Sequence, residues 1–420
     1  MSGAGSPVLP TGAAVYVVGG AVRDALLGLK GADRDWVVVG ARPEQLIEAG
    51  FKPVGQDFPV FLHPQTREEY ALARTERKTA PGYRGFVFHA APDVSLEEDL
   101  ERRDLTINAM AQAADGRLID PFGGQRDLAN RVLRHVGPAF SEDPVRILRL
   151  ARFAARFGDF QVDPETQKLL GTMVDAGEVD ALVPERVWQE LARGLMERHP
   201  SRLFEVLHGC GALARLLPEL NRVWNDRSGR LVDDAALNDE PLDVRWALLT
   251  IDLTSAEDCS AAEAMAQRLR VPAELRAMVQ LVARERGPVE RAFDLSANAM
   301  LEVIERCDGI RRPDRFLGML KASSYALPSM HSSMHPSMLP SPHGDRAPQV
   351  ERFVQALKAA RGVDAGSVAR HVPSELETSD GTSSDGTSSD GTSSGGTITE
   401  RIRLAVQRAR VDAIARSLAS

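Results

Sequence analysis

Short apolar runs alternate with short helical patterns over the first third of the chain. Residues 15–20 form a β-branched run that ends in two glycines, and residues 35–39 form a second apolar run. A helical pattern follows each run, at residues 22–29 and 43–49. Further short strands are expected at residues 59–62, 70–73 and 86–88. This alternation predicts a mixed α/β head over residues 15–137, preceded by an N-terminal tail of residues 1–14.

The segment between the last two of these strands is polar. It runs from Arg74 to Arg84 and contains the turn-forming pair Pro81-Gly82. We therefore expect a mobile loop at this place.

From residue 138 onward the spacing of apolar residues becomes helical. Ile147, Leu148 and Ala151 fall on one helix face, and Asp163-Pro164 is typical of the start of another helix. The pattern predicts an all-α neck over residues 138–222 and a helical body over residues 223–325.

Two low-complexity segments follow the body. Residues 329–348 alternate Ser, Met, His and Pro, and residues 378–396 repeat Ser-Asp-Gly-Thr. Such polar stretches cannot bury a core, so we expect residues 326–397 to be flexible linkers with a short helical segment. Residues 398–420 regain helical periodicity and carry five arginines, which predicts a C-terminal helix.

Composition and charge narrow the class of protein. The 420 residues carry a net charge of −8, which disfavours a general nucleic-acid coat but allows a local basic groove. No apolar run approaches the roughly 18 residues that a membrane helix needs, and the N-terminus lacks the pattern of a secretion signal. The three cysteines are widely spaced and form neither a metal pair nor a disulfide framework. We therefore expect a cytoplasmic protein without a membrane partner.

The turn at Gly19-Gly20 is the first candidate for chemistry. A strand ends there and a helix begins, with Arg23 in its first turn. Bare backbone amides and an arginine at one point suit a polyphosphate, although a tight turn with a structural role explains these residues equally well.

Two aspartates stand at the entrance of the second strand. Asp33 and Asp35 are two residues apart, so we expect their side chains on one face. Two close carboxylates repel each other unless a divalent cation lies between them. Beside a phosphate-binding turn, this pair favours two-metal nucleotidyl transfer over a solvated acidic turn. Glu69, at the start of a later strand, is a candidate third carboxylate, and a surface glutamate is almost as well supported.

Adjacent arginines form the next cluster. Arg102 and Arg103 precede Asp104 and Asn108, and together these residues supply donors for a phosphate or a ribose. A helix start with its usual charges has the same pattern, so the cluster alone is a weak signal.

A stripe of arginines follows on one predicted helix. The four side chains fall within an arc of roughly 120°, and they are Arg146, Arg149, Arg152 and Arg156. No acidic residue lies between Asp143 and Asp159 to pair with them. We therefore expect an anionic ligand rather than a solvated basic face.

Asp143 and Arg146 suggest how a base could be selected. An aspartate accepts a hydrogen bond from an exocyclic amine, and an arginine donates one to the neighbouring ring acceptor. Cytosine and adenine both present that edge, whereas uracil and guanine present a carbonyl and an N–H. Buried mismatched groups cost roughly 1–3 kcal/mol each, so this pair could serve as a protein template.

In their order along the chain, these motifs resemble those of the bacterial class II tRNA nucleotidyltransferases, the CCA-adding enzymes. Residues 19–24 and 33–35 are similar to the first motif of the family, and residues 102–110 to its second. Asp120-Pro-Phe-Gly-Gly124 matches the hinge between head and neck, and Glu142-Asp-Pro-Val-Arg146 matches the nucleotide template. The similarity covers residues 15–220.

The resemblance implies a fold, a reaction and a set of site residues. The fold is an α/β nucleotidyltransferase head with a polymerase-β-like small sheet, followed by an all-α neck and body. The reaction adds C, C and A from CTP and ATP to the 3′ end of tRNA, by attack of the 3′-hydroxyl on the α-phosphate, and repairs damaged ends. Asp33 and Asp35 would be catalytic and bind Mg²⁺, and Asp143 with Arg146 would select the base. The incoming nucleotide would be contacted by Gly20, Arg23, Arg103, Arg149 and Arg152. The loop at residues 74–84 lies where the family has the element needed to switch from C to A addition.

The body departs from the members it most resembles, which carry a histidine–aspartate phosphohydrolase domain after the neck. No histidine occurs between His208 and His331, and Ile251-Asp252 stands where the His-Asp doublet would fall. Such a metal centre needs imidazole ligands. We therefore expect residues 223–325 to keep helical packing and to lack hydrolytic activity.

Three other functions compete with CCA addition. A poly(A) polymerase shares the head and neck, but such enzymes generally carry basic extensions, whereas this chain is acidic. A CC-adding enzyme is a second option, which the retained loop disfavours. A non-catalytic RNA-binding protein is a third, which the intact pair Asp33 and Asp35 makes improbable.

Overall fold

The computed structural model describes residues 9–29, 33–54, 60–78, 86–327, 347–373 and 397–419. It forms two compact units, which are described separately. The first comprises Met1–Leu242 with Ala264–Val271, and the second comprises Asp243–Glu263 with Pro272–Ser420.

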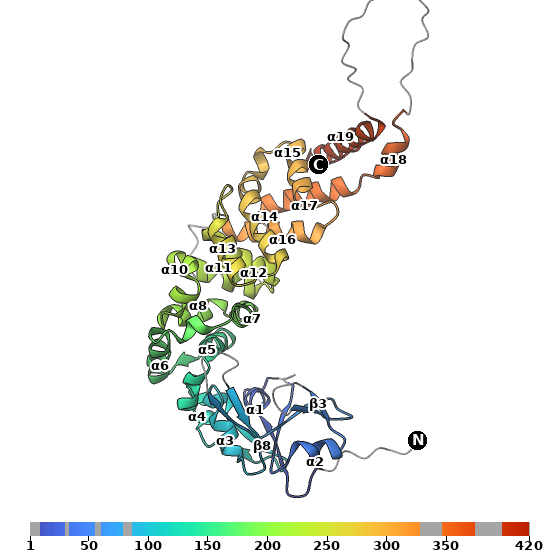
Figure 1. Ribbon diagram of the computed structural model, residues 1–420. Coiled ribbons are helices and arrows are strands. Elements are labelled where there is room, and N and C mark those ends of the chain that lie inside the picture. The colour runs from blue at the N-terminus through green and yellow to red at the C-terminus, as the bar shows by residue number, and fades with distance from the viewer. Residues whose placement is uncertain are drawn as a thin grey trace, which may run out of the picture. The chain divides into compact units, whose positions relative to one another are not determined.

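A seven-stranded sheet lies at the centre of the head, in the order β3-β4-β5-β2-β1-β8-β9 (Figure 1). β2 is antiparallel to β1 and parallel to β5, so that Asp35 is paired with Val18 on one side and with Glu69 on the other. The strands are β1 (Ala14–Val18), β2 (Asp35–Val39), β3 (Lys52–Val54), β4 (Val60–Leu62), β5 (Glu69–Leu72), β8 (Ala111–Ala113) and β9 (Leu118–Ile119). The predicted α/β head with a small sheet is confirmed.

Two apolar clusters form around neighbouring residues of β2. Val37 and Val38 point to opposite faces of the sheet because side chains alternate along a strand. Val37 belongs to a cluster with Leu100, and Val38 belongs to a cluster with Leu46. These leucines come from α3 (Leu96–Glu101) and α2 (Pro43–Glu48) respectively. The sheet therefore packs between helices on its two faces. β2 is its central strand, and the first residue of β2 lies at one end of the strands.

The segment predicted to be a loop at residues 74–84 is partly a strand. β6 (Thr75–Lys78) pairs antiparallel with β7 (Phe86–His89), and residues 79–85 lie outside the described residues. The loop prediction was therefore too long. The polar sequence Thr-Glu-Arg-Lys gave no hydrophobic signal, because a two-stranded ribbon is held by backbone hydrogen bonds that do not depend on apolar side chains.

The neck is mostly helical, but the prediction that it is all-α missed the short strand β11 (Gln161–Val162), which pairs parallel with β10 (Val132–Leu133). α5 (Val145–Arg156) packs against α7 (Pro184–Leu195) and α8 (Pro200–Gly209). Both α7 and α8 begin with proline, which has the backbone angle of a helical first residue and lacks the N–H that would be unpaired there. The other helices are α6 (Pro164–Asp175), α9 (Ala212–Leu216), α10 (Pro218–Val223) and α11 (Asp226–Leu237).

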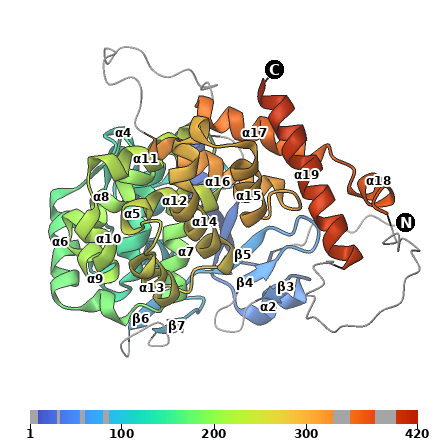
Figure 2. The ribbon, with the colours of Figure 1, turned by 90° about the horizontal axis from the view of Figure 1, so that it is seen from above.

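The second unit is also helical in its described part. α17 (Pro348–Arg361) and α15 (Ala297–Arg306) pack beside α19 (Ile398–Ala419), as Figure 2 shows. The other helices of this unit are α12 (Leu242–Leu249), α14 (Ala273–Glu290), α16 (Pro313–Ala326) and α18 (Ala365–Arg370), and α13 (Ser260–Arg268) is divided between the two units. The two low-complexity tracts lie almost wholly outside the described residues.

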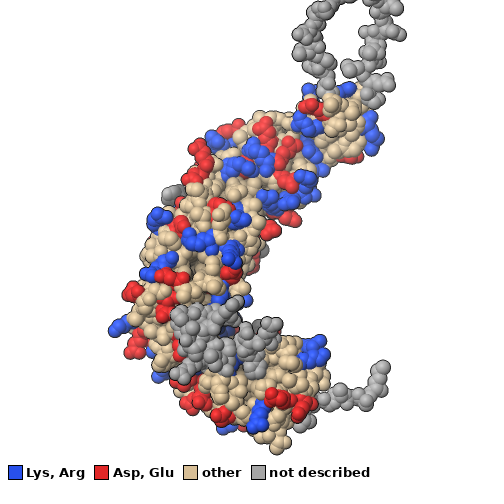
Figure 3. Space-filling model, viewed as in Figure 1, with Lys and Arg blue, Asp and Glu red and all other residues tan. Residues whose placement is uncertain are grey.

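Charges of both signs are interspersed over the face of the second unit seen in Figure 3. Among the described helices, none combines the length and the apolar character needed to cross a membrane.

Candidate active site

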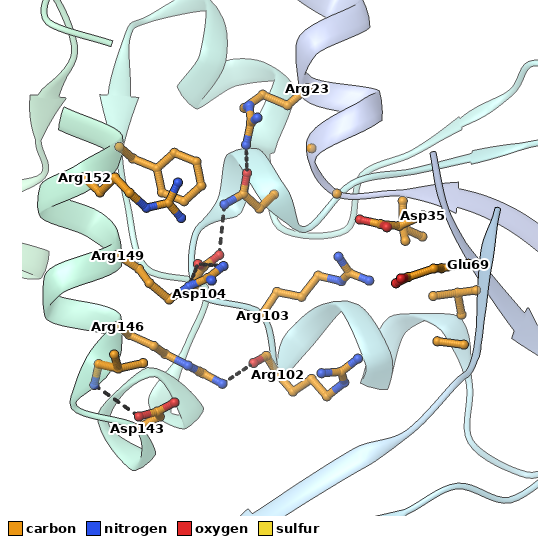
Figure 4. Close-up of a pocket in the computed structure, with 18 of the residues that line it drawn as sticks. Arg23, Asp35, Glu69, Arg102, Arg103, Asp104, Asp143, Arg146, Arg149 and Arg152 are labelled. Carbon is orange, nitrogen blue, oxygen red and sulfur yellow. Dashed lines mark hydrogen bonds and ion pairs between the residues drawn. The ribbon is translucent and has the colours of Figure 1, made fainter. Parts of the chain in front are cut away.

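A pocket of about 680 Å³ lies in the first unit, between the start of β2 and the neck helix α5 (Figure 4). Arginine is its most frequent lining residue, and the arginines are Arg23, Arg74, Arg102, Arg103, Arg146, Arg149, Arg152, Arg156 and Arg186. Its acidic lining residues are Asp35, Glu69, Asp104 and Asp143. The excess of basic side chains makes the pocket suited to an anionic ligand.

The glycine turn forms one wall of the pocket, and Gly19 and Gly20 both line it. Gly19 has φ +68°, a backbone angle that residues other than glycine rarely adopt. It links β1 directly to α1 (Gly20–Leu26). A Cβ at Gly19 would lie 2.8 Å from Nη1 of Arg103. The turn therefore needs glycine both for its backbone angle and for the close approach of that guanidinium.

Asp35 and Glu69 lie together, across the pocket from the arginines of α5 (Figure 4). They are the first residues of two adjacent parallel strands and are paired in register, so their side chains project from the same face. Both are exposed and both line the pocket, as Figure 4 shows. The third carboxylate that the sequence left open therefore lies beside Asp35.

Asp33 occupies a different position from the one that strand alternation implies. β2 begins at Asp35, so Asp33 lies two residues before the strand, where the rule of alternation does not apply. Asp33 is exposed and is not among the described residues that line the pocket. Its charge nevertheless acts on Asp35, as the pKa of that carboxyl indicates.

The pKa of Asp35 is raised above its ordinary value. The largest cause is the loss of hydration within the pocket, and the charge of Asp33 adds to it, whereas the charge of Arg103 acts in the opposite direction. Asp35 is exposed to solvent but also lines the pocket, which explains the partial loss of hydration. A nearby cation would favour the ionised carboxylate.

The carboxylates are suited to a Mg²⁺ ion whose remaining ligands are waters and the phosphates of a bound nucleotide. Among the described residues, no group of three acidic, histidine or cysteine side chains is close enough to enclose a metal. Mg²⁺, however, is usually held by one or two carboxylates, with waters and substrate phosphates as its other ligands. Asp35 and Glu69 supply such a pair, and Asp33 lies nearby.

Arg23 lies deeper than the sequence suggested. It is 3% exposed, and its guanidinium donates to Asp24 from Nε at 2.8 Å and to Asn108 from Nη1. The same group lies over the rings of Phe153 and Phe157, 5.1 and 5.3 Å from their centroids. Arg23 therefore lines the pocket while its hydrogen bond to Asn108 joins α1 to that motif and its position over Phe153 joins α1 to α5.

The arginine stripe on α5 has acidic partners, contrary to the expectation from its local sequence. Asp104 accepts from Nε of Arg149 at 2.9 Å, Glu190 accepts from Nε of Arg152 at 2.6 Å, and Asp24 accepts from Nη2 of Arg156 at 2.7 Å. These partners lie 38 to 132 residues away in the chain, so a search of the adjacent sequence could not find them.

The partners of the stripe show what it does in the fold. Asp24 and Asp104 belong to the head, whereas Arg149 and Arg156 belong to the neck, so their ion pairs join the two parts of the first unit. Each of these aspartates directly follows an arginine in the sequence, and such Arg-Asp pairs were the signal available for finding them.

The two predicted template residues are held by separate sets of bonds. Asp143 accepts from Nη2 of Arg186 at 2.9 Å and from Nη1 at 3.3 Å, while its Oδ1 also accepts from the backbone N–H of Val145. Arg146 donates to the backbone carbonyls of Ala139 at 2.8 Å and of Arg102 at 2.7 Å. Sequence reasoning did not single out Arg186, because nothing in its own segment of the chain points to a ligand.

Comparisons with known proteins place these features in a family. Residues 15–134 match the family model described as the poly A polymerase head domain, and residues 159–223 match that of the probable RNA and SrmB-binding site of polymerase A. The chain is 53% identical over 384 residues to the multifunctional CCA protein of an Azoarcus species, which covers 84% of this chain and 91% of that protein. It is 50% identical over 441 aligned positions to the multifunctional CCA protein of Burkholderia cenocepacia, covering 96% of this chain and 99% of that one.

Solved structures agree with this assignment. A CCA-adding enzyme in complex with CTP is 27% identical and has a TM-score of 0.57, over 76% of each chain. The Bacillus stearothermophilus CCA-adding enzyme in complex with CTP has a TM-score of 0.65 at 22% identity, over 96% of this chain and 89% of that one, and at this identity it shows the fold alone. By its identity to relatives that it covers almost completely, the chain belongs to the family of the multifunctional CCA proteins.

Proposed function

We propose that this protein adds C, C and A stepwise to the 3′ end of tRNA from CTP and ATP, without a nucleic-acid template, and restores damaged CCA ends. The observation that carries the proposal is the pocket in which Asp35 and Glu69 face a wall of arginines. This arrangement occurs in a chain whose relatives are multifunctional CCA proteins over nearly their whole length.

The carboxylates and the arginines divide the work between them. Asp35 and Glu69, with Asp33 nearby, would hold Mg²⁺. The metal would lower the pKa of the attacking 3′-hydroxyl and neutralise charge on the triphosphate. Arg149 and Arg152 line the opposite wall, and Arg103 lies beside the carboxylates (Figure 4). All three would bind phosphate oxygens by charge-assisted hydrogen bonds.

The glycine turn and Arg23 would complete the nucleotide site. Because Gly19 and Gly20 have no side chains, the triphosphate can approach the backbone of the turn closely. Arg23 is already hydrogen-bonded to Asp24 and Asn108. It would therefore hold the turn in place as well as contact the nucleotide.

Asp143 and Arg146 would select the base. The carboxylate of Asp143, oriented by Arg186, would accept from the exocyclic amine of cytosine or adenine. Uracil and guanine would leave buried groups unpaired at the same place, which disfavours them.

Replacing Asp143 with alanine is expected to relax the choice of nucleotide more than it slows transfer. Loss of the acceptor should reduce the preference for CTP over UTP about tenfold or more, since an unpaired buried group costs about 1–3 kcal/mol. The measurement is kcat/KM for the correct and the incorrect nucleotide with one tRNA. Asp159→Ala is the matched control, because that carboxylate pairs with Arg131 outside the pocket. Unchanged discrimination in Asp143→Ala contradicts the template role.

The test of the function uses purified protein, Mg²⁺, CTP, ATP and a tRNA that ends at the discriminator base. Product of three added nucleotides, in the order C, C and A, supports the proposal. A homopolymer tail indicates a poly(A) polymerase, and arrest after two nucleotides indicates a CC-adding enzyme. A tRNA lacking only its terminal A should be completed by the same preparation.

We also propose that the body has no phosphohydrolase activity and that the protein acts in the cytoplasm. The first proposal rests on the lack of histidine in the sequence between His208 and His331. The second rests on the three cysteines, which are free thiols and of which Cys210 and Cys307 are buried. When the protein is incubated with a 2′,3′-cyclic nucleotide and a divalent transition metal, the cyclic nucleotide is expected to stay intact. Hydrolysis that persists after Asp35→Asn would show that the body is active.

A further inference from the structure

Asp99 is a buried carboxylate that lies behind the pocket and has been assigned no role above. It lies in α3 and is 0% exposed. Its Oδ1 accepts from Arg102 at 2.6 Å and from the backbone N–H of Arg74 at 3.2 Å, and its Oδ2 accepts from Nη2 of Arg103 at 3.2 Å. Asp99 does not line the pocket, but all three of its partners do.

The bond to Asp99 fixes Arg103 from one side only. Nη2 of Arg103 is held by Asp99, whereas Nη1 lies against the Gly19 turn. Nε of Arg103 is buried and has no hydrogen-bond partner among the described residues. The charge of Arg103 also partly offsets the rise in the pKa of Asp35 that desolvation causes. The guanidinium is thus anchored to Asp99 on one side and lies against the glycine turn on the other.

Asp99 also holds the backbone where the β6–β7 hairpin begins. Arg74 is the residue directly before β6, and its N–H is bonded to the same oxygen as Arg102. One carboxylate therefore connects the base of this hairpin with both arginines of the pocket wall.

We propose that Asp99 is a positioning residue that holds Arg102 and Arg103 in the geometry needed to bind the triphosphate. The proposal rests on the proposed function and deepens it, because Asp99 acts through these arginines and does not touch the nucleotide. Burial disfavours the charged carboxylate, but the two guanidinium groups outweigh this effect and keep its pKa below the ordinary value. Asp99 is therefore an anion when nucleotide binds.

Asp99→Asn is the variant that tests the proposal. Asparagine has nearly the same size and keeps an oxygen that can accept from the N–H of Arg74, so the variant removes the charge that orients the arginines and spares the hairpin. We expect KM for both CTP and ATP to rise about tenfold, the effect of losing one charge-assisted hydrogen bond, with kcat changed far less. The dissociation constant of CTP, measured by calorimetry without tRNA, should rise in parallel.

Asp127→Asn is the matched control. Asp127 is another buried carboxylate of the head, 1% exposed, and it accepts from Thr106 and Arg134 outside the pocket. We expect it to lower the Tm as Asp99→Asn does, but to leave both KM values within about twofold of wild type, since its partners are not in the pocket. If Asp99→Asn does not fold, Asp99→Ser removes the same charge, keeps an oxygen and serves as the second variant.

A double variant shows whether Asp99 acts through Arg103. In the background of Arg103→Ala, the substitution Asp99→Asn should raise KM by a smaller factor than in wild type, because residues that act through one another are not additive. A folded Asp99 variant with wild-type KM and CTP affinity overturns the proposal. An equal rise of KM in Asp127→Asn also overturns it, because the effect would then be a general loss of stability. Failure of the wild type to add C, C and A, despite normal CTP binding, would instead count against the proposed function alone.

Discussion

Replacing Asp35 with asparagine is expected to abolish nearly all incorporation of both CTP and ATP, by a factor on the order of a thousand. Asparagine has almost the same shape but no negative charge, so it would bind Mg²⁺ poorly, and the stabilisation of charge in the transition state would be lost. Single-turnover incorporation at saturating nucleotide is the measurement. Because the loss concerns the chemical step, kcat should fall far more than the affinity for tRNA.

The stability of the same variant distinguishes a functional role from a structural one. The raised pKa of Asp35 means that the folded protein disfavours the ionised carboxylate, so a neutral side chain should not lower the free energy of unfolding at neutral pH. Thermal unfolding is expected to give a Tm equal to or above that of the wild type.

Glu69→Gln and Glu44→Gln provide the comparison for Asp35→Asn. Glu69 is paired in register with Asp35 and lines the pocket, so its variant should also lose activity. Glu44 is an exposed residue in the first turn of α2, and its variant should retain full activity. Full activity of Asp35→Asn would remove the basis for a metal site here, and loss of activity with a lower Tm would point to a folding defect.

The longer strands with a clear apolar run were predicted from the sequence, whereas the short strands β3, β8 and β9 were missed. The strand at residues 35–39 was predicted to the residue, because its apolar run lies between the polar pair Asp33-Arg34 and Gly40. The pairing of Asp35 with Glu69 could not be predicted, because register depends on which strands are neighbours, and 33 residues lie between these two positions along the chain. For the same reason, Glu69 remained an open candidate until the structure placed it in the pocket.

The arginines of α5 show a second limit of prediction from sequence. Their spacing correctly placed them on one face, but the inference that they lacked acidic partners was wrong. Asp24 and Asp104 come from the head, and only the folded chain brings them to Arg156 and Arg149. The stripe therefore both lines the pocket and joins the head to the neck, and the second role leaves no local pattern.

Replacing Asp104 with asparagine is expected to cause the largest loss of stability among these variants. Asp104 is 7% exposed, and its Oδ2 accepts from Nε and Nη2 of Arg149 at 2.9 and 2.8 Å. Its Oδ1 accepts from Asn108 and from the N–H of Leu105, both at 2.9 Å. Because the side chain of Arg149 is 38% exposed, the loss is that of hydrogen bonds to a charged group, about 1.5–3 kcal/mol, which corresponds to a Tm roughly 5 °C lower for a unit of this size.

Two further variants separate the ion pair from other effects of Asp104→Asn. Arg149→Ala should also destabilise, and the double variant should lose less free energy of unfolding than the sum of the two single losses, because both remove the same pair. Asp115→Asn is the control, since Asp115 is an exposed carboxylate whose oxygen lies 4.0 Å from Arg117. It should change the free energy of unfolding by no more than about 0.5 kcal/mol. Additive losses would show that Asp104 and Arg149 act independently.

The pH dependence of stability gives a check on Asp104 that does not require a second substitution. Burial alone raises the pKa of Asp104, but the charge of Arg149 and the hydrogen bonds from Asn108 and Arg149 outweigh it and hold the pKa well below its usual range. A depressed pKa in the folded state means that the carboxylate stabilises the fold above the unfolded pKa of about 3.9, and that this contribution declines as the pH falls toward the folded value. The difference in free energy of unfolding between wild type and Asp104→Asn should therefore be constant from about pH 8 to pH 5 and shrink in stronger acid. A difference that shrinks already near neutral pH would contradict the ion pair with Arg149.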